Sequence, residues 1–300
     1  MYLGIDTASI AGNKAINWAA AKAGGCQYAI FRGTYNTWAD PTWKLEAERA
    51  RAQGITVGAY LFPVMSVSAP SPAEQVAAFS KAVGPLSPSD LPPTLDVEFA
   101  DGIAKTGRSR LELLAWIRAA VAALKETYGV PPMIYTSARI WDGTDPDSLD
   151  IDGLGVATPE LLECPLWLAR YPFKAGLTAI TQASQVDAIA LPPVPKAWID
   201  ATNVWLHQYQ GDARSFPGCN GAVDLNRFFD LRRGAKGERV RWVQRILGIT
   251  ADGEFSSATL QAVVKFQSEH QLMADGIVGP RTFAHLCWAT AAAAATRNAA

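Results

Sequence analysis

Residues 91–98 read Leu-Pro-Pro-Thr-Leu-Asp-Val-Glu. This stretch is a short apolar run with β-forming residues, and it ends on two carboxylates, Asp96 and Glu98. Runs of this kind are typical of buried strands. The chain contains about eight of them, at residues 2–6, 28–33, 56–62, 93–98, 132–137, 166–171, 204–209 and 222–225.

Stretches with helical spacing separate the early runs. Residues 42–53 form one such stretch, and Gly54 is expected to stop it. Residues 108–128 form another, in which apolar side chains recur near the spacing of a helix. Alternation of strands and helices predicts a parallel sheet, and about eight strands predict a closed barrel. From residue 172 to 203 the helical rhythm fades, so the fold expected is an irregular, TIM-like β/α-barrel of the α/β class.

The composition changes near residue 232, after which an internal repeat appears. Ala251-Asp252-Gly253 precedes Thr259 by the same offset at which Ala274-Asp275-Gly276 precedes Thr282. We therefore expect a barrel over residues 1–231, a small three-helix module over 232–288 and an Ala-rich tail over 289–300. Because the repeat has its own apolar positions, the barrel is expected to fold without it.

Bulk properties limit the classes of partner. Hydrophobic residues make up 49% of the chain and the net charge is −1, so no overall charge attracts nucleic acid or an anionic membrane. The N-terminus lacks the pattern of a signal peptide, and no apolar run is long enough to cross a bilayer. A monomer is expected, with no nucleic-acid or membrane partner.

Carboxylates recur where the predicted strands end, which is where parallel barrels carry their catalytic groups. The four are Asp6, Asp96, Glu98 and Asp224. Converging like charges raise the pKa of at least one member, as a general acid at neutral pH requires. Asp96 and Glu98 point to the same side of one strand, with backbones roughly 6 to 7 Å apart. The alternative to a catalytic role is that Asp96 and Glu98 form ion pairs with nearby arginines.

The ordered motifs resemble the glycoside hydrolase family 25 lysozymes, the Chalaropsis-type N-acetylmuramidases, over nearly all of residues 1–229. The matching pieces are Gly4-Ile5-Asp6, Ile16-Asn17-Trp18, Ala29-Ile30-Phe31-Arg32, Asp40-Pro41, Val57-Gly58-Ala59-Tyr60, Leu95-Asp96-Val97-Glu98, Ile134-Tyr135-Thr136-Ser137, Leu166-Trp167-Leu168-Ala169, Gln208-Tyr209 and Val223-Asp224-Leu225.

This resemblance implies hydrolysis of the β-1,4 bond between N-acetylmuramic acid and N-acetylglucosamine in peptidoglycan, without a cofactor or metal. It implies that Glu98 is the general acid and that Asp6, Asp96 and Asp224 are the other active-site carboxylates. Asp96 either orients the substrate's acetamido group or stabilises positive charge. Side chains expected to contact substrate are Tyr60, Tyr135, Arg32, Tyr35, Trp167 and Gln208. Tyr35 stands where the family commonly has an acid, and Leu61 where it has a His, which affects the expected substrate subsites.

Residues 234–286 resemble the type 1 peptidoglycan-binding domain, with Asp252-Gly253 and Asp275-Gly276 expected to build turns. A lytic barrel joined to a wall-binding module fits a phage endolysin that is made in the host cytoplasm and reaches the wall through a separate pore; a bacterial enzyme exported by another route is the alternative. Three rival functions remain: a zinc amidase or peptidase, disfavoured because only His207 lies in the barrel, a non-catalytic wall-binding protein and a chitin hydrolase.

Overall fold

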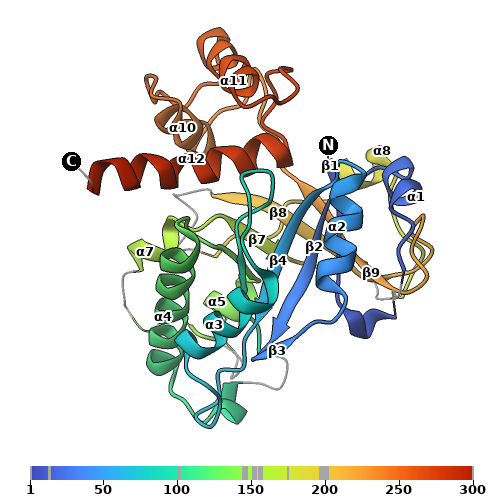
Figure 1. The fold of residues 1–300 in the computed structure, drawn as a ribbon, viewed down its shortest axis with the longest axis vertical. Helices are drawn as coiled ribbons and strands as arrows, with labels where there is room; N and C mark the ends of the chain where they lie inside the picture. The colour runs from blue at the N-terminus through green and yellow to red at the C-terminus, as the bar shows by residue number, and fades with distance from the viewer. Residues whose placement is uncertain are drawn as a thin grey trace.

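A nine-stranded sheet closes into a barrel in the computed structural model, which describes residues 2–12, 15–99, 103–143, 148–150, 154, 158–173, 176–195 and 203–298 (Figure 1). The strand order is β1-β9-β8-β7-β6-β5-β4-β2-β3, and pairing of β1 with β2 closes an eight-stranded barrel with β3 outside it. The predicted barrel is confirmed. The strands are β1 (Tyr2–Thr7), β2 (Cys26–Tyr35), β3 (Trp38–Ala39), β4 (Thr56–Phe62), β5 (Thr94–Asp96), β6 (Met133–Thr136), β7 (Leu166–Ala169), β8 (Val204–Ala213) and β9 (Val223–Phe228).

Most neighbouring barrel strands are parallel, but β9 runs antiparallel to both β1 and β8. Because of that reversal, the first residues of β9 lie beside the last residues of β1, and Asp224 pairs with Asp6. We call this end of the barrel, where the parallel strands have their carboxyl ends, the mouth.

Helices between the strands cover the outside of the barrel (Figure 1). Two of them begin with a reciprocal capping box: Ser71 with Glu74 at the start of α3, and Ser109 with Glu112 at the start of α4. The barrel helices are α1 (Trp18–Ala23), α2 (Trp43–Ala52), α3 (Pro72–Val83), α4 (Arg110–Tyr128), α5 (Ala138–Asp142), α7 (Pro159–Leu162) and α8 (Ala183–Asp187), with 3-10 turns at Ser9–Ala11 and Ile103–Thr106. Among the described residues of 172–203, only α8 is helical.

The C-terminal module consists of α10 (Glu238–Ile246), α11 (Ser257–Glu269) and α12 (Pro280–Asn298). Two glutamines, Gln244 and Gln267, organise its internal repeat. Each donates to an Asp carboxylate, a backbone carbonyl and a Thr hydroxyl, and each accepts from a Gly amide, at matching offsets: Asp252, Glu254, Thr259 and Gly253 for the first, and Asp275, Ile277, Thr282 and Gly276 for the second. Both glycines have positive φ, which permits the turn.

The module packs on the end of the barrel opposite the mouth, where α12 crosses the strands' amino ends (Figure 1). Phe283 of α12 is fully buried, and its ring centroid lies 4.4 Å from that of Trp205 and 5.5 Å from that of Phe228. Trp288 Nε1 donates to the backbone oxygen of Asp90, which precedes β5. One cluster of buried side chains thus continues from the barrel into the module. The sequence predicted apolar positions within the module itself and a barrel that folds without it, but it did not predict this shared core.

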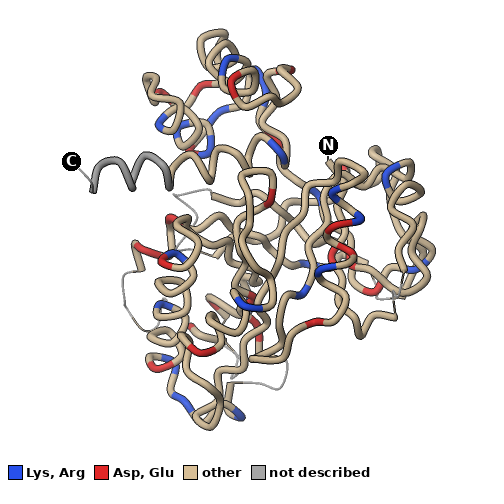
Figure 2. The backbone as a smooth tube through the Cα atoms, in the orientation of Figure 1, with Lys and Arg blue, Asp and Glu red and all other residues tan. Residues whose placement is uncertain are grey.

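Lys and Arg are interspersed with Asp and Glu along both the barrel and the module (Figure 2). No helix in the described part of the chain is long and apolar enough to cross a membrane.

Candidate active site

Four carboxylates meet at the barrel mouth. Asp6 is the penultimate residue of β1 and pairs with Asp224 of β9, Asp96 ends β5, and Glu98 follows two residues later. Burial is the main cause that raises the pKa of each carboxyl. Their mutual charges add to it: Asp224 and Glu98 act on Asp6, Glu98 and Asp6 act on Asp96, and Asp224 acts on Glu98. The predicted convergence is therefore present in the structure.

Gln208 of β8 connects two of these carboxylates with two tyrosines. Its Nε2 donates to Asp6 Oδ2 at 2.6 Å and to Asp224 Oδ2 at 3.4 Å. Its Oε1 accepts from the hydroxyl of Tyr135 at 2.7 Å and from the hydroxyl of Tyr171. Gln208 was predicted to contact substrate, but it is buried, and its amide instead holds the polar groups of the mouth in place.

Asn226 makes the corresponding connection on β9. Its Nδ2 donates to Asp6 Oδ2 at 2.6 Å, and its Oδ1 accepts from Trp167 Nε1 at 2.7 Å. Two amide donors therefore converge on one oxygen of Asp6, and hydrogen bonds to a carboxylate favour its charged form. Burial outweighs them, since the pKa of Asp6 stays well above its usual value.

Asp96 and Glu98 differ in exposure and in hydrogen bonding. Asp96 is buried, and its Oδ1 has no hydrogen-bond partner in the part of the chain that the structure describes. A buried acceptor without a partner is costly unless a ligand satisfies it. Glu98 is half-buried, and burial, ahead of the charge of Asp224, raises its pKa. Part of Glu98 therefore stays accessible to a ligand, and the carboxyl keeps its proton to a higher pH than a free glutamic acid does.

Asp224 is the carboxylate of β9 in this cluster, and its pKa is raised. Burial raises it to about 6, although the backbone N–H of Asp212 donates to its Oδ1 at 2.6 Å and opposes that rise. This carboxyl changes charge near neutral pH, which couples the field at the mouth to the pH of the surroundings.

Two predicted substrate-contacting tyrosines lie at the mouth. Burial and the charges of Asp6 and Asp96 raise the pKa of Tyr60. Tyr135 lines a groove together with Glu98, and its ring packs edge-on against Trp167 at 4.7 Å between centroids. Both hydroxyls therefore stay protonated at neutral pH and can donate hydrogen bonds.

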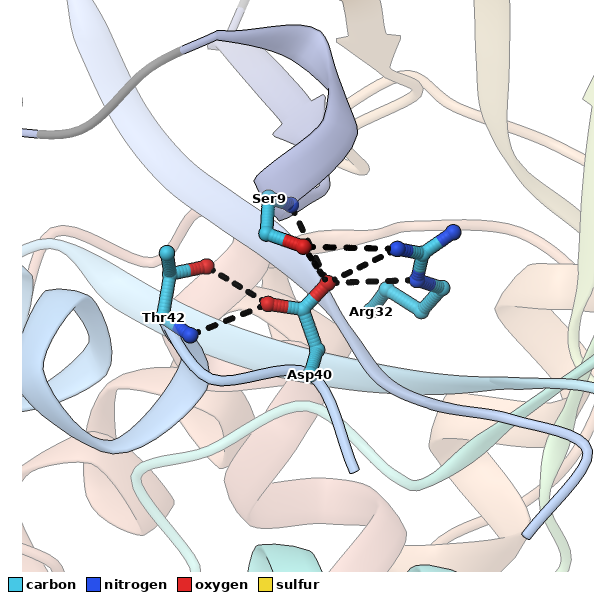
Figure 3. Close-up of polar contacts among 4 residues, drawn as sticks. All are labelled: Ser9, Arg32, Asp40 and Thr42. Carbon is cyan, nitrogen blue, oxygen red and sulfur yellow. Dashed lines mark hydrogen bonds and ion pairs between the residues drawn. The ribbon is translucent and has the colours of Figure 1, made fainter. Parts of the chain in front are cut away.

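Arg32 lies in a closed polar network (Figure 3). Its Nε and Nη2 donate to Asp40 Oδ2 at 3.2 and 3.0 Å, and the same carboxyl accepts from Ser9 and Thr42. Both partners of the ion pair are buried. The pair joins the turn after β1, the end of β2 and the start of α2, so Arg32 holds the mouth's framework together and does not present its guanidinium to solvent.

The remaining two predicted contacts, Tyr35 and Trp167, lie at opposite extremes of exposure. Tyr35, the last residue of β2, is 44% exposed and stacks on Phe62 at 5.3 Å between ring centroids. Trp167 is buried beneath Tyr135, so it packs under the mouth instead of facing the groove. Position near the end of a strand does not predict whether a side chain is exposed or buried, because adjacent residues of a strand point to opposite sides of the sheet.

Sequence reasoning missed Asn226 and Tyr171 as site residues. Asn226 lies two residues beyond Asp224 on one strand and therefore shares its face, a signal that was available in the alternation of β9. Tyr171 is the last residue of the run predicted at 166–171, so its strand-end position was a signal; in the structure it follows β7, and its hydroxyl donates to Gln208 from the loop. No group of three or more His, Cys, Asp or Glu suited to a metal ion occurs among the described residues.

Comparisons with known proteins agree with this geometry. Residues 5–209 match the model of glycosyl hydrolases family 25, and residues 236–286 match that of a putative peptidoglycan binding domain. A zinc D-Ala-D-Ala carboxypeptidase of Streptomyces albus G is 46% identical over 61 residues, which are 18% of this chain and 24% of that protein. The chain thus spans about a quarter of the length of the curated relative that it matches.

Similar solved structures cover the barrel. The bacterial lysozyme of Streptomyces coelicolor has a TM-score of 0.59 at 25% identity, over 76% of this chain and 91% of that one. The muramidase of Trichobolus zukalii has a TM-score of 0.58 at 23% identity, over 76% and 94% of the two chains, and shows the same fold. The family match extends over most of the chain and contains Asp6, Asp96 and Glu98, and the chain therefore belongs to family 25 of the glycosyl hydrolases.

Proposed function

We propose that this glycoside hydrolase is a muramidase, which cleaves the β-1,4 bond between N-acetylmuramic acid and N-acetylglucosamine in peptidoglycan. The observation that carries the proposal is the placement of Glu98, a half-buried carboxyl with a raised pKa in a cluster of carboxylates at the barrel mouth. The family match, the similarity to the Streptomyces coelicolor lysozyme and the peptidoglycan-binding match of the module support this substrate.

Glu98 acts as the general acid in this proposal. Its proton passes to the glycosidic oxygen as the bond from that oxygen to the anomeric carbon breaks, and the sugar left behind carries developing positive charge. The charged carboxylates of the cluster stabilise that charge, because they lie in a largely buried site where electrostatic attraction is stronger than in water.

Asp96 orients the substrate's acetamido group. Its unpaired, buried Oδ1 is suited to accept the acetamido N–H, which directs the acetamido oxygen toward the anomeric carbon. The acetamido oxygen bonds to the anomeric carbon as the leaving oxygen departs with the proton of Glu98, which closes a ring. Water then attacks the anomeric carbon and breaks that bond, while the Glu98 carboxylate takes a proton from the water. If Asp96 instead only stabilises positive charge, a thiazoline analogue of the cyclic intermediate should fail to inhibit the enzyme.

The test uses purified bacterial walls with the complete protein. Release of reducing ends, with mass spectrometry placing muramic acid at each new reducing end, supports the proposal. A new reducing end on N-acetylglucosamine would overturn it, as would faster cleavage of chitin oligomers than of peptidoglycan. Wall binding without any release of reducing ends favours the non-catalytic alternative.

The protein acts on the bacterial cell wall. We propose further that it does so as a monomer and as a phage endolysin, made in the host cytoplasm and admitted to the wall through a separate membrane pore. A hydrolase joined to a wall-binding module suits host lysis. Light scattering of the purified protein tests the monomer, and lysis of a producing bacterium only after its inner membrane is permeabilised tests the route.

A further inference from the structure

A groove of about 390 Å³ extends from Glu98 over the ends of β6 and β7. Its lining includes the rings of Tyr135 and Tyr171 and the side chains of Arg139 and Arg170. Neither arginine is assigned a role by the chemistry proposed above, yet both share one groove with the general acid. Their charge therefore acts on whatever part of the substrate lies next to the bond that is cut.

The fold places the two arginines at the same edge of the barrel. β6 and β7 are parallel neighbours, with Thr136 paired to Leu168, so the residues that follow both strands emerge side by side. Arg139 lies in the first turn of α5, and Arg170 directly follows β7. Both are exposed.

The backbone around each arginine is held in place. The side chain of Ser137 caps α5 by accepting from Ile140 N. The backbone N–H of Arg170 donates to Gln208 O at 3.1 Å, and Arg170 O lies 3.0 Å from His207 Nε2. The backbone thus fixes the position from which each long side chain reaches the groove.

The charges in the groove favour an anionic ligand. Two guanidinium groups, those of Arg139 and Arg170, line the groove beside the carboxyl of Glu98. Guanidinium groups bind carboxylates through paired, charge-assisted hydrogen bonds. A polymer of N-acetylglucosamine has no carboxylate to offer, whereas muramic acid carries a lactyl group, to which a peptide with free carboxylates is attached.

We propose that Arg139 and Arg170 bind the free carboxylates of the stem peptide, on the muramic acid side of the cut. This inference rests on the proposed function and deepens it, because it makes the charge of the substrate a determinant of specificity. Arg139 and Arg170 are specificity-determining residues that raise affinity and leave the chemical step to the carboxylate cluster.

The test measures KM and kcat on three soluble glycan fragments: one with its stem peptide, the same fragment with its carboxylates amidated, and one stripped of peptide by an amidase, which leaves the lactyl carboxylate. The double variant Arg139→Gln and Arg170→Gln should raise KM for the stem-bearing fragment about tenfold or more, since a hydrogen bond to a charged group typically contributes that much. The kcat should stay within about a factor of two, as expected for uniform binding. The amidated fragment should have a similarly raised KM with the original enzyme, and the double variant should raise it no further.

The control is Arg118→Gln, which removes an arginine from the outer helix α4, where it pairs with Glu160. It should leave both constants unchanged. An effect confined to the stem-bearing fragment identifies the peptide carboxylates as the ligand, whereas an effect on the stripped fragment alone would overturn the inference, because the lactyl carboxylate is free only in that fragment.

Equal losses on charged and amidated fragments, or no loss at all, overturn the inference while the muramidase activity stands. An original enzyme that releases no reducing ends from any fragment refutes the proposed function, and this inference with it.

Discussion

Replacing Phe283 by Ala tests whether the module and the barrel share one core. The ring is fully buried in α12 and lies against Trp205 and Phe228 of the barrel as well as Trp242 of the module. Loss of a buried Phe side chain typically lowers the free energy of unfolding by about 3 to 5 kcal/mol. That is a large share of the roughly 5 to 15 kcal/mol that stabilises a domain.

The two arrangements of the core predict different unfolding curves. If the core is shared, the loss shifts the unfolding of the whole chain, by roughly 6 to 20 °C in melting temperature. Far-ultraviolet circular dichroism and the fluorescence of the tryptophans should move together, and activity on soluble fragments should be lost over the same range. Met273→Ala, at a position 81% exposed on the module, is the matched control and should change stability by no more than about 0.5 kcal/mol.

A second, independent transition would refute this reasoning. If only a small early step moves while the activity of the barrel persists to its original temperature, the module has a core of its own. The same logic applies to removal of residues 232–300. That truncation uncovers Trp205 and Phe228, so we expect it to yield an aggregation-prone barrel.

Three further predictions concern particular side chains. Gln244→Leu and Gln267→Leu should each lower the free energy of unfolding by about 1 to 3 kcal/mol in urea unfolding, because each leaves buried polar partners unsatisfied; no loss in either would contradict the role given to the repeat. Asp40→Asn should cost about 3 to 5 kcal/mol, since the buried Arg32 loses its counter-charge, and stability equal to that of the original protein would mean that Arg32 finds another partner. The raised pKa of Asp224, about 6, means that its carboxyl favours folding below its unfolded pKa of about 4 and that this contribution is lost as pH rises through 6. Asp224→Asn should therefore raise the free energy of unfolding, relative to the original protein, more at pH 8 than at pH 4. Unfolding curves of both proteins at both pH values measure this, and an equal gain at the two pH values would contradict this cause.

The strand-end rule located the acids because it depends only on topology. In a parallel barrel every strand ends at the same face, so Asp6, Asp96 and Glu98 had to meet once the strands were recognised. Asp224 met them for a different reason, the antiparallel direction of β9, which the run of apolar residues does not reveal.

Hydrogen-bond networks and domain contacts were beyond the reach of the pattern. Arg32 was predicted to contact substrate, but in the structure it forms a buried ion pair with Asp40. Trp167 was also predicted to contact substrate, but it is buried under the mouth, where its ring nitrogen donates to Asn226. Phe283 shows the same limit, since an apolar position in a helix does not tell whether it faces its own module or a neighbour.

Glu98→Gln tests the central claim most directly. The substitution keeps the size of the side chain but removes the transferable proton, so release of reducing ends from peptidoglycan should fall by roughly 100-fold or more while binding to walls is retained. Glu160→Gln, at a carboxyl exposed on α7, should leave activity unchanged. Near-normal turnover by Glu98→Gln, in a protein whose circular dichroism is unaltered, would contradict the account and assign the acid's role to another carboxyl.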